Sequence, residues 1–227
     1  MKKLLLLIAI IPFLISCQKN DFDLYKISFP MDITPLGAKY KIREDKGYSD
    51  MVRYNTTDED LLFFDGYNFS GSLDDSNSLF ENSLSFFKEI GNNKIEAYKI
   101  MITTSSEATK FEEMLVERLG KTDFYYQKTD FTFRIWNAEG KTYFFETNSS
   151  GEYNGKKFKS CDLFVVDSKN RFFINFASAG GFQYYGDYLY EKDKPENTGK
   201  KFTYRDFIDQ REKEDGKDSY FLKNYVK

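Results

Sequence analysis

The N-terminal stretch divides this chain into a short segment outside the fold and a long segment that must form it. Lys2 and Lys3 are positively charged, and residues 4–15 form an apolar run that contains only one breaker, Pro12. This run is shorter than the roughly 20 apolar residues that a membrane-spanning helix needs. A basic start, a short apolar centre and a small residue, Ser16, are typical of a secretory signal peptide. We therefore expect residues 1–16 to be a signal peptide that is removed.

The end of this stretch, Leu14-Ile15-Ser16-Cys17, resembles the lipobox of bacterial lipoproteins. In that family the signal is cut before the cysteine, which carries the acyl chains. The resemblance implies a lipidated Cys17, a tether over residues 17–23 and a membrane partner held through the acyl chains, each buried CH₂ contributing ~0.8 kcal/mol. Gln18 stands where an Asp favours inner-membrane retention, so the resemblance implies the bacterial cell envelope and favours the outer membrane. The alternative is an ordinary signal peptide, or a buried apolar N-terminus, in which Cys17 is incidental.

Composition excludes several classes of function. Removal of 16 of the 227 residues leaves 211, enough for one large domain or two small ones. Without Lys2 and Lys3, 31 basic residues face 36 acidic ones, a net charge of −5 with no basic block, which argues against nucleic acid. The chain has no histidine, which excludes Ser-His-Asp and Cys-His catalysis and His-liganded zinc. We expect no cofactor and no metal site, and any enzyme here must use carboxylates, Lys or Tyr.

If Cys17 is lipidated, Cys161 is the only thiol left. It shares one face of an apolar strand with Leu163 and Val165. Free cysteine packs as a small hydrophobe, and no neighbouring base is evident to activate it. We therefore expect Cys161 to be a buried structural residue.

The N-terminal half of the remaining chain shows short elements. Residues 24–29 alternate as a strand does and stop at Pro30, and residues 39–42 and 51–54 are two further short strands. Asp65-Gly66 between apolar runs predicts a hairpin, because this pair supplies the positive φ of a tight turn. Residues 74–90 fit either a helix or a hairpin, and we favour the helix.

The strongest helical signal of the folded part follows a strand at 95–103. Thr104 and Glu107 have capping-box spacing, and Gly120 ends the segment. The apolar positions recur at helical spacing: Ala108, Phe111, Leu115 and Leu119. The sequence therefore predicts a helix over about 105–119 that packs on a sheet, with its acidic outer face in solvent.

Two similar segments follow, residues 133–144 and residues 163–174. Each reads as two apolar strands joined by Asn/Asp-x-x-Gly/Asn, a sequence typical of a tight turn. Asn154-Gly155 provides a third turn between them. Together they predict a four-stranded antiparallel meander at about 130–177.

The C-terminal part is aromatic and then charged. Residues 182–190 are the most aromatic stretch, residues 191–227 are a charged extension, and Thr203 caps a helix that runs to about Glu214. We predict an α+β fold that is mainly antiparallel sheet, with the 105–119 helix and this C-terminal helix. Residues 24–227 form a single domain, in which 24–90 and 94–190 are candidate subdomains.

Aromatic residues make up 19% of the chain and supply the candidate binding groups. Tyr and Trp offer a flat apolar face with a polar tip, which suits glycans and protein partners. The candidates are Trp136, Tyr184, Tyr185, Tyr188 and Tyr190. Alternatively, these rings fill the core of the sheet.

The sequence thus favours a non-catalytic envelope lipoprotein that binds a protein partner or a glycan. Neutralisation of a toxic effector is one form of the protein-binding role. No catalytic residue is assigned. The rival prediction is a carboxylate-dependent hydrolase, which a deep pocket with two facing acids would favour.

Overall fold

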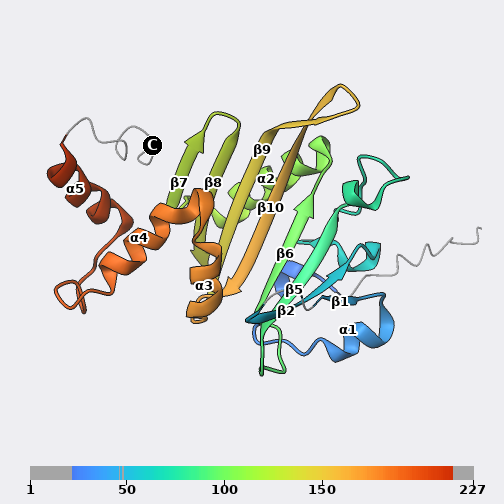
Figure 1. Cartoon of the computed structure of the whole chain (residues 1–227), viewed down its shortest axis with the longest axis horizontal. Coiled ribbons are helices and arrows are strands. Elements are labelled where there is room, and N and C mark those ends of the chain that lie inside the picture. The colour runs from blue at the N-terminus through green and yellow to red at the C-terminus, as the bar shows by residue number, and fades with distance from the viewer. Residues whose placement is uncertain (1–21, 46, 48, 217–227) are drawn as a thin grey trace, which may run out of the picture.

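The protein is an α+β domain built on one antiparallel sheet with helices on both faces (Figure 1). The structure is a computed structural model that describes residues 22–45, 47 and 49–216. The sheet has eight strands, and all neighbouring strands are antiparallel. Their order is β1 (Arg43–Asp45), β2 (Met51–Thr56), β5 (Ser83–Glu89), β6 (Ala97–Ile102), β10 (Lys156–Asp167), β9 (Lys141–Tyr153), β8 (Phe131–Ala138) and β7 (Phe124–Lys128).

Helix α2 (Ser105–Leu119) covers one face of this sheet, and the short helices α3 (Arg171–Ala177) and α4 (Gln183–Lys192) lie in front of the other face (Figure 1). Helix α5 (Tyr204–Asp215) packs beside α4 at one end of the molecule. The remaining elements are small: η1 (Leu24–Lys26), α1 (Thr34–Lys39), η2 (Glu59–Leu61), the hairpin of β3 (Phe63–Phe64) and β4 (Tyr67–Asn68), η3 (Ser78–Phe80) and η4 (Gly180–Phe182).

The predicted helix at 105–119 is confirmed with the same bounds. Its residues Ala108, Phe111 and Leu115 are fully buried in the core between α2 and the sheet. The capping box is not formed, since the Thr104 hydroxyl donates to the Glu107 carboxylate and makes no bond to the helix backbone.

Glu107 instead holds the loop that precedes β5. It accepts hydrogen bonds from Gly71 N at 3.1 Å and from Asn82 Nδ2 at 2.7 Å. The N-terminus of α2 is therefore tied to a segment more than twenty residues earlier in the chain.

The meander exists, but it lies at 124–167, as β7-β8-β9-β10, and not at about 130–177. The turn at Asn154-Gly155 is confirmed, with both residues at positive φ. The second predicted hairpin at 163–174 is wrong, because β10 ends at Asp167 and Asn170 caps α3 by accepting from Phe173 N at 2.9 Å. Helix formation lets α3 bury Phe173 and Ile174 against the sheet.

Most of the aromatic stretch at 182–190 lies in helix α4, which begins at Gln183. Phe182, Tyr185, Tyr188 and Leu189 recur at helical spacing and are buried in the second core. Just before α4, Gly181 lies against the Phe133 ring, which leaves no room for a side chain, because an added Cβ would meet ring atoms at 2.1 Å. The chain therefore crosses the sheet closely at this point.

The N-terminal half follows the sequence only in part. The strand at 51–54 and the hairpin at Asp65-Gly66 are confirmed as β2 and the β3–β4 pair. Residues 24–29 are not a strand, because Asp23 caps the 3₁₀ turn η1 by accepting from Tyr25 N. Residues 39–42 end helix α1 and lead into β1, whereas 74–90 contains η3 and strand β5 in place of the favoured helix.

The sheet is continuous across the segments 24–90 and 94–190, because β5 pairs with β6. The predicted strand at 95–103 is β6. At the C-terminal end, α5 has the predicted capping box between Thr203 and Asp206.

Candidate functional site

The five candidate aromatic residues do not form one binding platform. Trp136 is 1% exposed on the α2 side of the sheet, where its Nε1 donates to Gly120 O at 2.9 Å. Tyr185 and Tyr188 belong to α4 and are buried on the opposite side of the sheet, and Tyr184 is half-buried beside them. Only Tyr190 is well exposed, at 71%. Most of these rings therefore fill the two hydrophobic cores, which is the alternative that the sequence left open.

A groove crosses the sheet on the face that carries α3 and α4, where Figure 1 shows strands with no helix in front of them. It consists of three adjoining cavities of about 560, 290 and 710 Å³. The first two share Leu79 and Met101, and the last two share Glu146.

The floor of this groove is a single cross-strand row. Residues that are direct partners in neighbouring strands point to the same face, so the register places six side chains side by side. The row is Ser83 (β5), Met101 (β6), Asp162 (β10), Glu146 (β9), Phe133 (β8) and Tyr126 (β7). At ~4.8 Å between strands, five spacings give a floor about 24 Å long.

Two carboxylates face each other at the centre of this row. Glu146 and Asp162 are direct cross-strand partners, and Lys99 Nζ lies 2.5 Å from Asp162 Oδ2. Glu146 makes no hydrogen bond or ion pair to any part of the chain that the structure describes. Burial, and then the charge of Asp162, raise the pKa of the Glu146 carboxyl, while Lys99 opposes them. Like charges directly opposite each other destabilise a sheet, so this arrangement costs folding free energy, as functional sites often do.

A β-bulge creates the carboxylate pair. Gly151 pairs with Phe158, but the register shifts before Ser160, which pairs with Asn148. Ser149 and Ser150 therefore lie opposite the single residue Lys159. Asn148 stabilises the bulge, because its Oδ1 accepts from Ser150 N at 2.8 Å and from Ser150 Oγ at 2.7 Å.

Counting outward from Tyr153 opposite Lys156, a hairpin without the bulge would place Asp162 opposite Thr147. Glu146 would then lie opposite Leu163, whose side chain is in the core on the α2 side. The register shift is what brings the two acids to the same face.

The two ends of the groove differ in chemistry. The cavity beside β1, β2 and β5 is lined by hydroxyl and amide side chains and by cations, with no acid among its lining residues. The cavity beside β7 and β8 contains aromatic rings: Tyr126 and Phe133 stack at 5.6 Å, and Phe133 and Phe131 at 6.2 Å. Phe131, at the end of this stack, is half-buried. Polar side chains along a groove with rings at one end suit a polar polymer such as a glycan.

Glu146, Asp162 and Lys99 were not singled out in the sequence. The available signal was a charged residue inside an apolar strand, since Glu146 follows Tyr143–Phe145 and Asp162 precedes Leu163–Val166. Which acid faces which is fixed by the register, and the sequence does not show the bulge that sets it.

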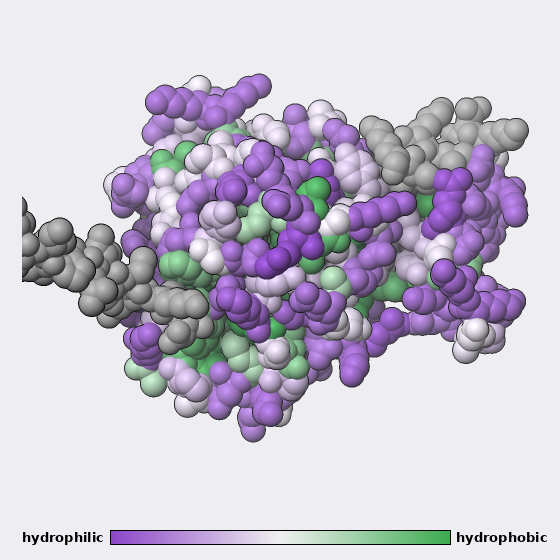
Figure 2. Space-filling view, turned by 180° about the vertical axis from the view of Figure 1, so that it is seen from behind, coloured by the Kyte–Doolittle hydropathy of each residue, from purple (hydrophilic) through white to green (hydrophobic). Residues whose placement is uncertain are grey.

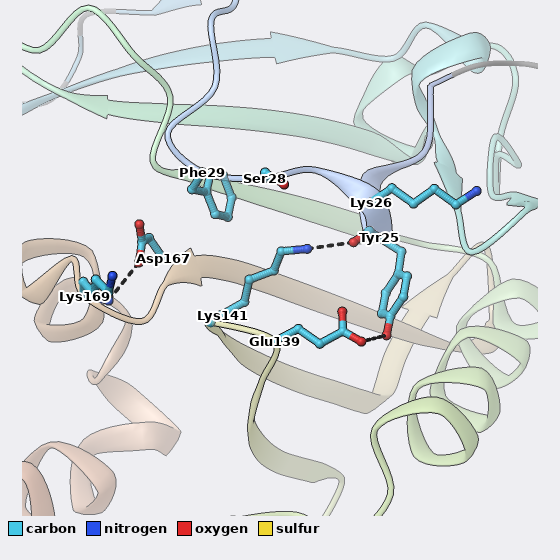
Figure 3. A pocket seen from close by; sticks show the side chains of 9 residues that line it. Tyr25, Lys26, Ser28, Phe29, Glu139, Lys141, Asp167 and Lys169 are labelled. Atoms are coloured by element: carbon cyan, nitrogen blue, oxygen red, sulfur yellow. Dashed lines mark hydrogen bonds between the residues drawn. The ribbon is translucent and has the colours of Figure 1, made fainter.

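A separate pocket of about 510 Å³ lies where η1 meets the turn between β8 and β9 (Figure 3). Lys141 points from β9 toward the η1 backbone, and its Nζ donates to Tyr25 O at 2.7 Å. Tyr25 OH donates to Glu139 Oε1 at 3.0 Å. Burial lowers the pKa of the Lys141 amine, which is 8% exposed as a residue. These polar groups are used to hold the N-terminal segment against the sheet.

The outer side of α2 carries charged side chains. Glu112 is bound by both Arg134 and Lys159, while Glu113 and Glu117 are exposed. Figure 2 shows that the side of the molecule carrying α2 is largely hydrophilic, with scattered hydrophobic residues. We expect this face to be in contact with solvent.

Cys161 is buried with a free thiol, as expected, and burial raises its pKa well above the usual value. Cys17 and the rest of residues 1–21 lie outside the described part of the chain. Among the described residues, no three or more Cys, Asp or Glu side chains are grouped to hold a metal ion. No described helix has both the length and the apolar character needed to cross a membrane.

Comparison of the chain with protein-family models, with curated proteins and with solved structures found no match. The function must therefore be inferred from the sequence and from the geometry of the groove.

Proposed function

We propose that this protein is a lipid-anchored lipoprotein of the bacterial cell envelope, favouring the outer membrane, whose domain binds a glycan chain without cleaving it. The N-terminal stretch that ends at Cys17 supports the anchor. The observation that supports glycan binding is the groove, with its floor of six side chains from six strands. A protein partner, the other class that the sequence favours, would more commonly use a flat or convex surface with a hydrophobic centre.

The groove offers a glycan two kinds of contact. Ser83, Ser85 and Asn55 present hydroxyl and amide groups along β2 and β5, which can exchange hydrogen bonds with sugar hydroxyls. At the other end, the partly exposed Phe131 ring can pack against the apolar face of a sugar. Glu146 and Asp162 lie between these ends, where their carboxyl oxygens can accept hydrogen bonds from sugar hydroxyls.

Binding is tested with the chain lacking residues 1–17, titrated against envelope and matrix polysaccharides. Phe131→Ala and Asp162→Asn lie on the groove and should each weaken binding by about tenfold, the effect of losing a contact of ~1.4 kcal/mol. Glu113→Gln on the outer side of α2 is the control and should bind as the unmodified chain does. Unchanged glycan binding in both groove variants would contradict the proposal. Binding of a protein through the same groove would make the ligand a protein and not a glycan.

The lipid anchor is tested separately. The Cys17→Ala variant should incorporate no labelled fatty acid, because the acyl chains have no other predicted attachment site. Cys161→Ala is the matched control and should keep the label, since Cys161 is buried in the domain. Labelling of Cys17→Ala at the level of the unmodified protein would refute the lipoprotein assignment.

A second candidate function is favoured by one observation, the Glu146–Asp162 pair. Direct cross-strand partners have Cβ atoms ~5 Å apart, and retaining glycosidases place their two carboxyl groups ~5–5.5 Å apart. Glu146, whose pKa is raised, suits a general acid, and Asp162, which is ion-paired with Lys99, suits a nucleophile.

The hydrolase candidate predicts that incubation with a bound glycan releases new reducing ends. Glu146→Gln should abolish this release while the variant still binds the chain. A glycan that binds without any new reducing ends would exclude the hydrolase and leave the binding function in place.

A further inference from the structure

A second large cavity, of about 860 Å³, lies away from the groove, at the opposite end of the strands. It is lined by residues of α3, α4, the start of α5, the loop after α2, and the adjoining ends of β8 and β9. Its charged lining residues are four cations and one acid: Lys121, Arg171, Lys192, Arg205 and Asp123. The chain as a whole has a net charge of −3, so this excess of positive charge is local.

The four cations are bound only weakly by the protein. Arg171 pairs with Asp193, and Arg205 Nε lies 2.9 Å from Asp209 Oδ1, but both pairs are about half exposed. Exposed ion pairs contribute ~0–1 kcal/mol, so a ligand anion can replace the carboxylate in each. Lys121 has no ion pair among the described residues. A concave site lined by one sign of charge also concentrates counter-ions.

Lys192 completes the cation set from helix α4. Its Nζ lies 5.6 Å from the centre of the Tyr188 ring. This contact leaves the three N–H donors of the ammonium group available to a ligand.

A chain of oriented hydrogen bonds ends in a free donor at this cavity. Thr142 Oγ1 donates to Asn137 Oδ1 at 2.8 Å, and Asn137 Nδ2 donates to Tyr185 OH at 3.2 Å. Because the Tyr185 oxygen accepts this bond, its own proton remains to be donated, and it has no acceptor within the described chain. Tyr185 is 5% exposed and lines the cavity, so this donor has little contact with bulk solvent. A buried donor without an acceptor is unfavourable until a ligand accepts from it.

Asp123 does not cancel this positive site. Its Oδ2 accepts from Asn137 N at 2.8 Å and from Asn137 Nδ2 at 3.2 Å. Asp123 therefore orients the Asn137 amide, and this amide donates to the Tyr185 oxygen, so the Tyr185 proton stays available to a ligand.

We propose that this cavity binds a small organic anion that carries a phosphate or a carboxylate group. Arg171 and Arg205 present planar guanidinium groups that match an oxyanion, Lys121 and Lys192 add charge, and the Tyr185 hydroxyl donates to it. The volume is in the range of ~300–1,000 Å³ that holds a metabolite-sized molecule, and it exceeds the size of a lone phosphate ion. This site does not depend on the groove or on its ligand.

The test uses calorimetry on the chain lacking residues 1–17, with inorganic phosphate, glucose 6-phosphate, citrate and glucose as probes. Glucose 6-phosphate or citrate should bind, glucose should not, and binding should weaken as salt is added. Preference for glucose 6-phosphate over citrate would assign a phosphate group, and the reverse preference a carboxylate.

Two variants and a matched control locate the binding. Lys192→Gln and Tyr185→Phe should each weaken affinity by about tenfold, the effect of one charge-assisted hydrogen bond. Lys110→Gln is the control, because Lys110 also lies over a tyrosine ring, that of Tyr67 at 4.7 Å, but on the α2 side. No binding of any oxyanion, or equal affinity in the Lys192→Gln, Tyr185→Phe and Lys110→Gln variants, would overturn the proposal.

Discussion

Replacing Glu146 by Gln should stabilise the fold while it impairs glycan binding or glycan cleavage in the groove. The folded state raises the pKa of Glu146, so it binds the proton more tightly than the unfolded chain does. Ionisation of Glu146 therefore destabilises the fold, and the penalty grows as pH rises through the ordinary value of 4.5 and the raised one. Below the ordinary value both states are protonated and the penalty is absent. The Gln variant should gain stability at pH 7 and gain nothing near pH 4.

The size of this gain follows from the position of the pair. Like charges directly opposite on neighbouring strands cost up to ~1 kcal/mol, and burial of Glu146 adds to that cost. We expect a gain of about 1 kcal/mol, which raises the Tm of a domain of this size by ~2–4 °C. Asp162→Asn removes the same repulsion but also breaks the ion pair with Lys99, so its effect on stability should be near zero.

Urea unfolding at the two pH values measures the effect, with the emission of Trp136 as the signal. Trp136 is the only tryptophan and is 1% exposed, so its emission should shift when the α2 side of the sheet opens. Glu113→Gln makes the same chemical change on the exposed surface of α2 and should alter stability by less than ~0.5 kcal/mol. The reasoning is refuted if Glu146→Gln destabilises the fold at pH 7, or if its gain is as large at pH 4.

Three further substitutions test the packing around the sheet. Asn82→Ala should cost about 3 kcal/mol in urea unfolding, because Asn82 Nδ2 donates to Phe69 O and its Oδ1 accepts from Thr103 N, which lose their partners; a loss below 1 kcal/mol would contradict this role. Thr203→Ala removes the cap of α5 and should cost about 1 kcal/mol, seen as faster amide exchange in α5 alone; slower or unchanged exchange would argue against the cap. Gly155→Val forces a branched residue to a φ of 73° and should cost ~1–2 kcal/mol, so unchanged stability would contradict the turn geometry.

Features set by a few neighbouring residues could be predicted from the sequence. The turns at Asp65-Gly66 and Asn154-Gly155 need positive φ, and both residues of each pair have it. Thr203 and Asp206 form the capping box that their spacing predicts. Such signals depend on local backbone geometry, which the rest of the fold does not override.

Helices α3 and α4, which cover one face of the sheet, were not predicted from the sequence. Residues 163–174 contain an apolar run that fits a strand, and the second hairpin was inferred from it. In the structure Phe173 and Ile174 cover the sheet from helix α3, because that face needs a packed layer. The same reason turns residues 182–190 into helix α4, although the spacing of Phe182, Tyr185 and Leu189 already fitted a helix.

The groove was harder to predict than the fold, because it depends on a shift of one residue in the register between β9 and β10. Asp162 and Glu146 share a face only because Ser149 and Ser150 bulge opposite Lys159. The bulge is supported at both sides: Asn148 accepts from Ser150, and Lys159 N donates to Ser105 Oγ at the start of α2. A sequence pattern with period two cannot show where such an extra residue will fall.

This dependence is also an argument that the carboxylate pair is functional. Many side chains at position 146 would keep the strand and avoid the repulsion, since the neighbouring positions on this face, Thr142 and Phe144, are uncharged. Instead a charged residue with a raised pKa lies at the centre of the groove, with no ion pair to a described residue, beside an acid that is paired with Lys99. Groups that cost the fold stability are best explained by a ligand that uses them. If Glu146→Gln stabilises the domain but weakens glycan binding or stops glycan cleavage, then the carboxylate that destabilises the fold is also the one that acts on the ligand.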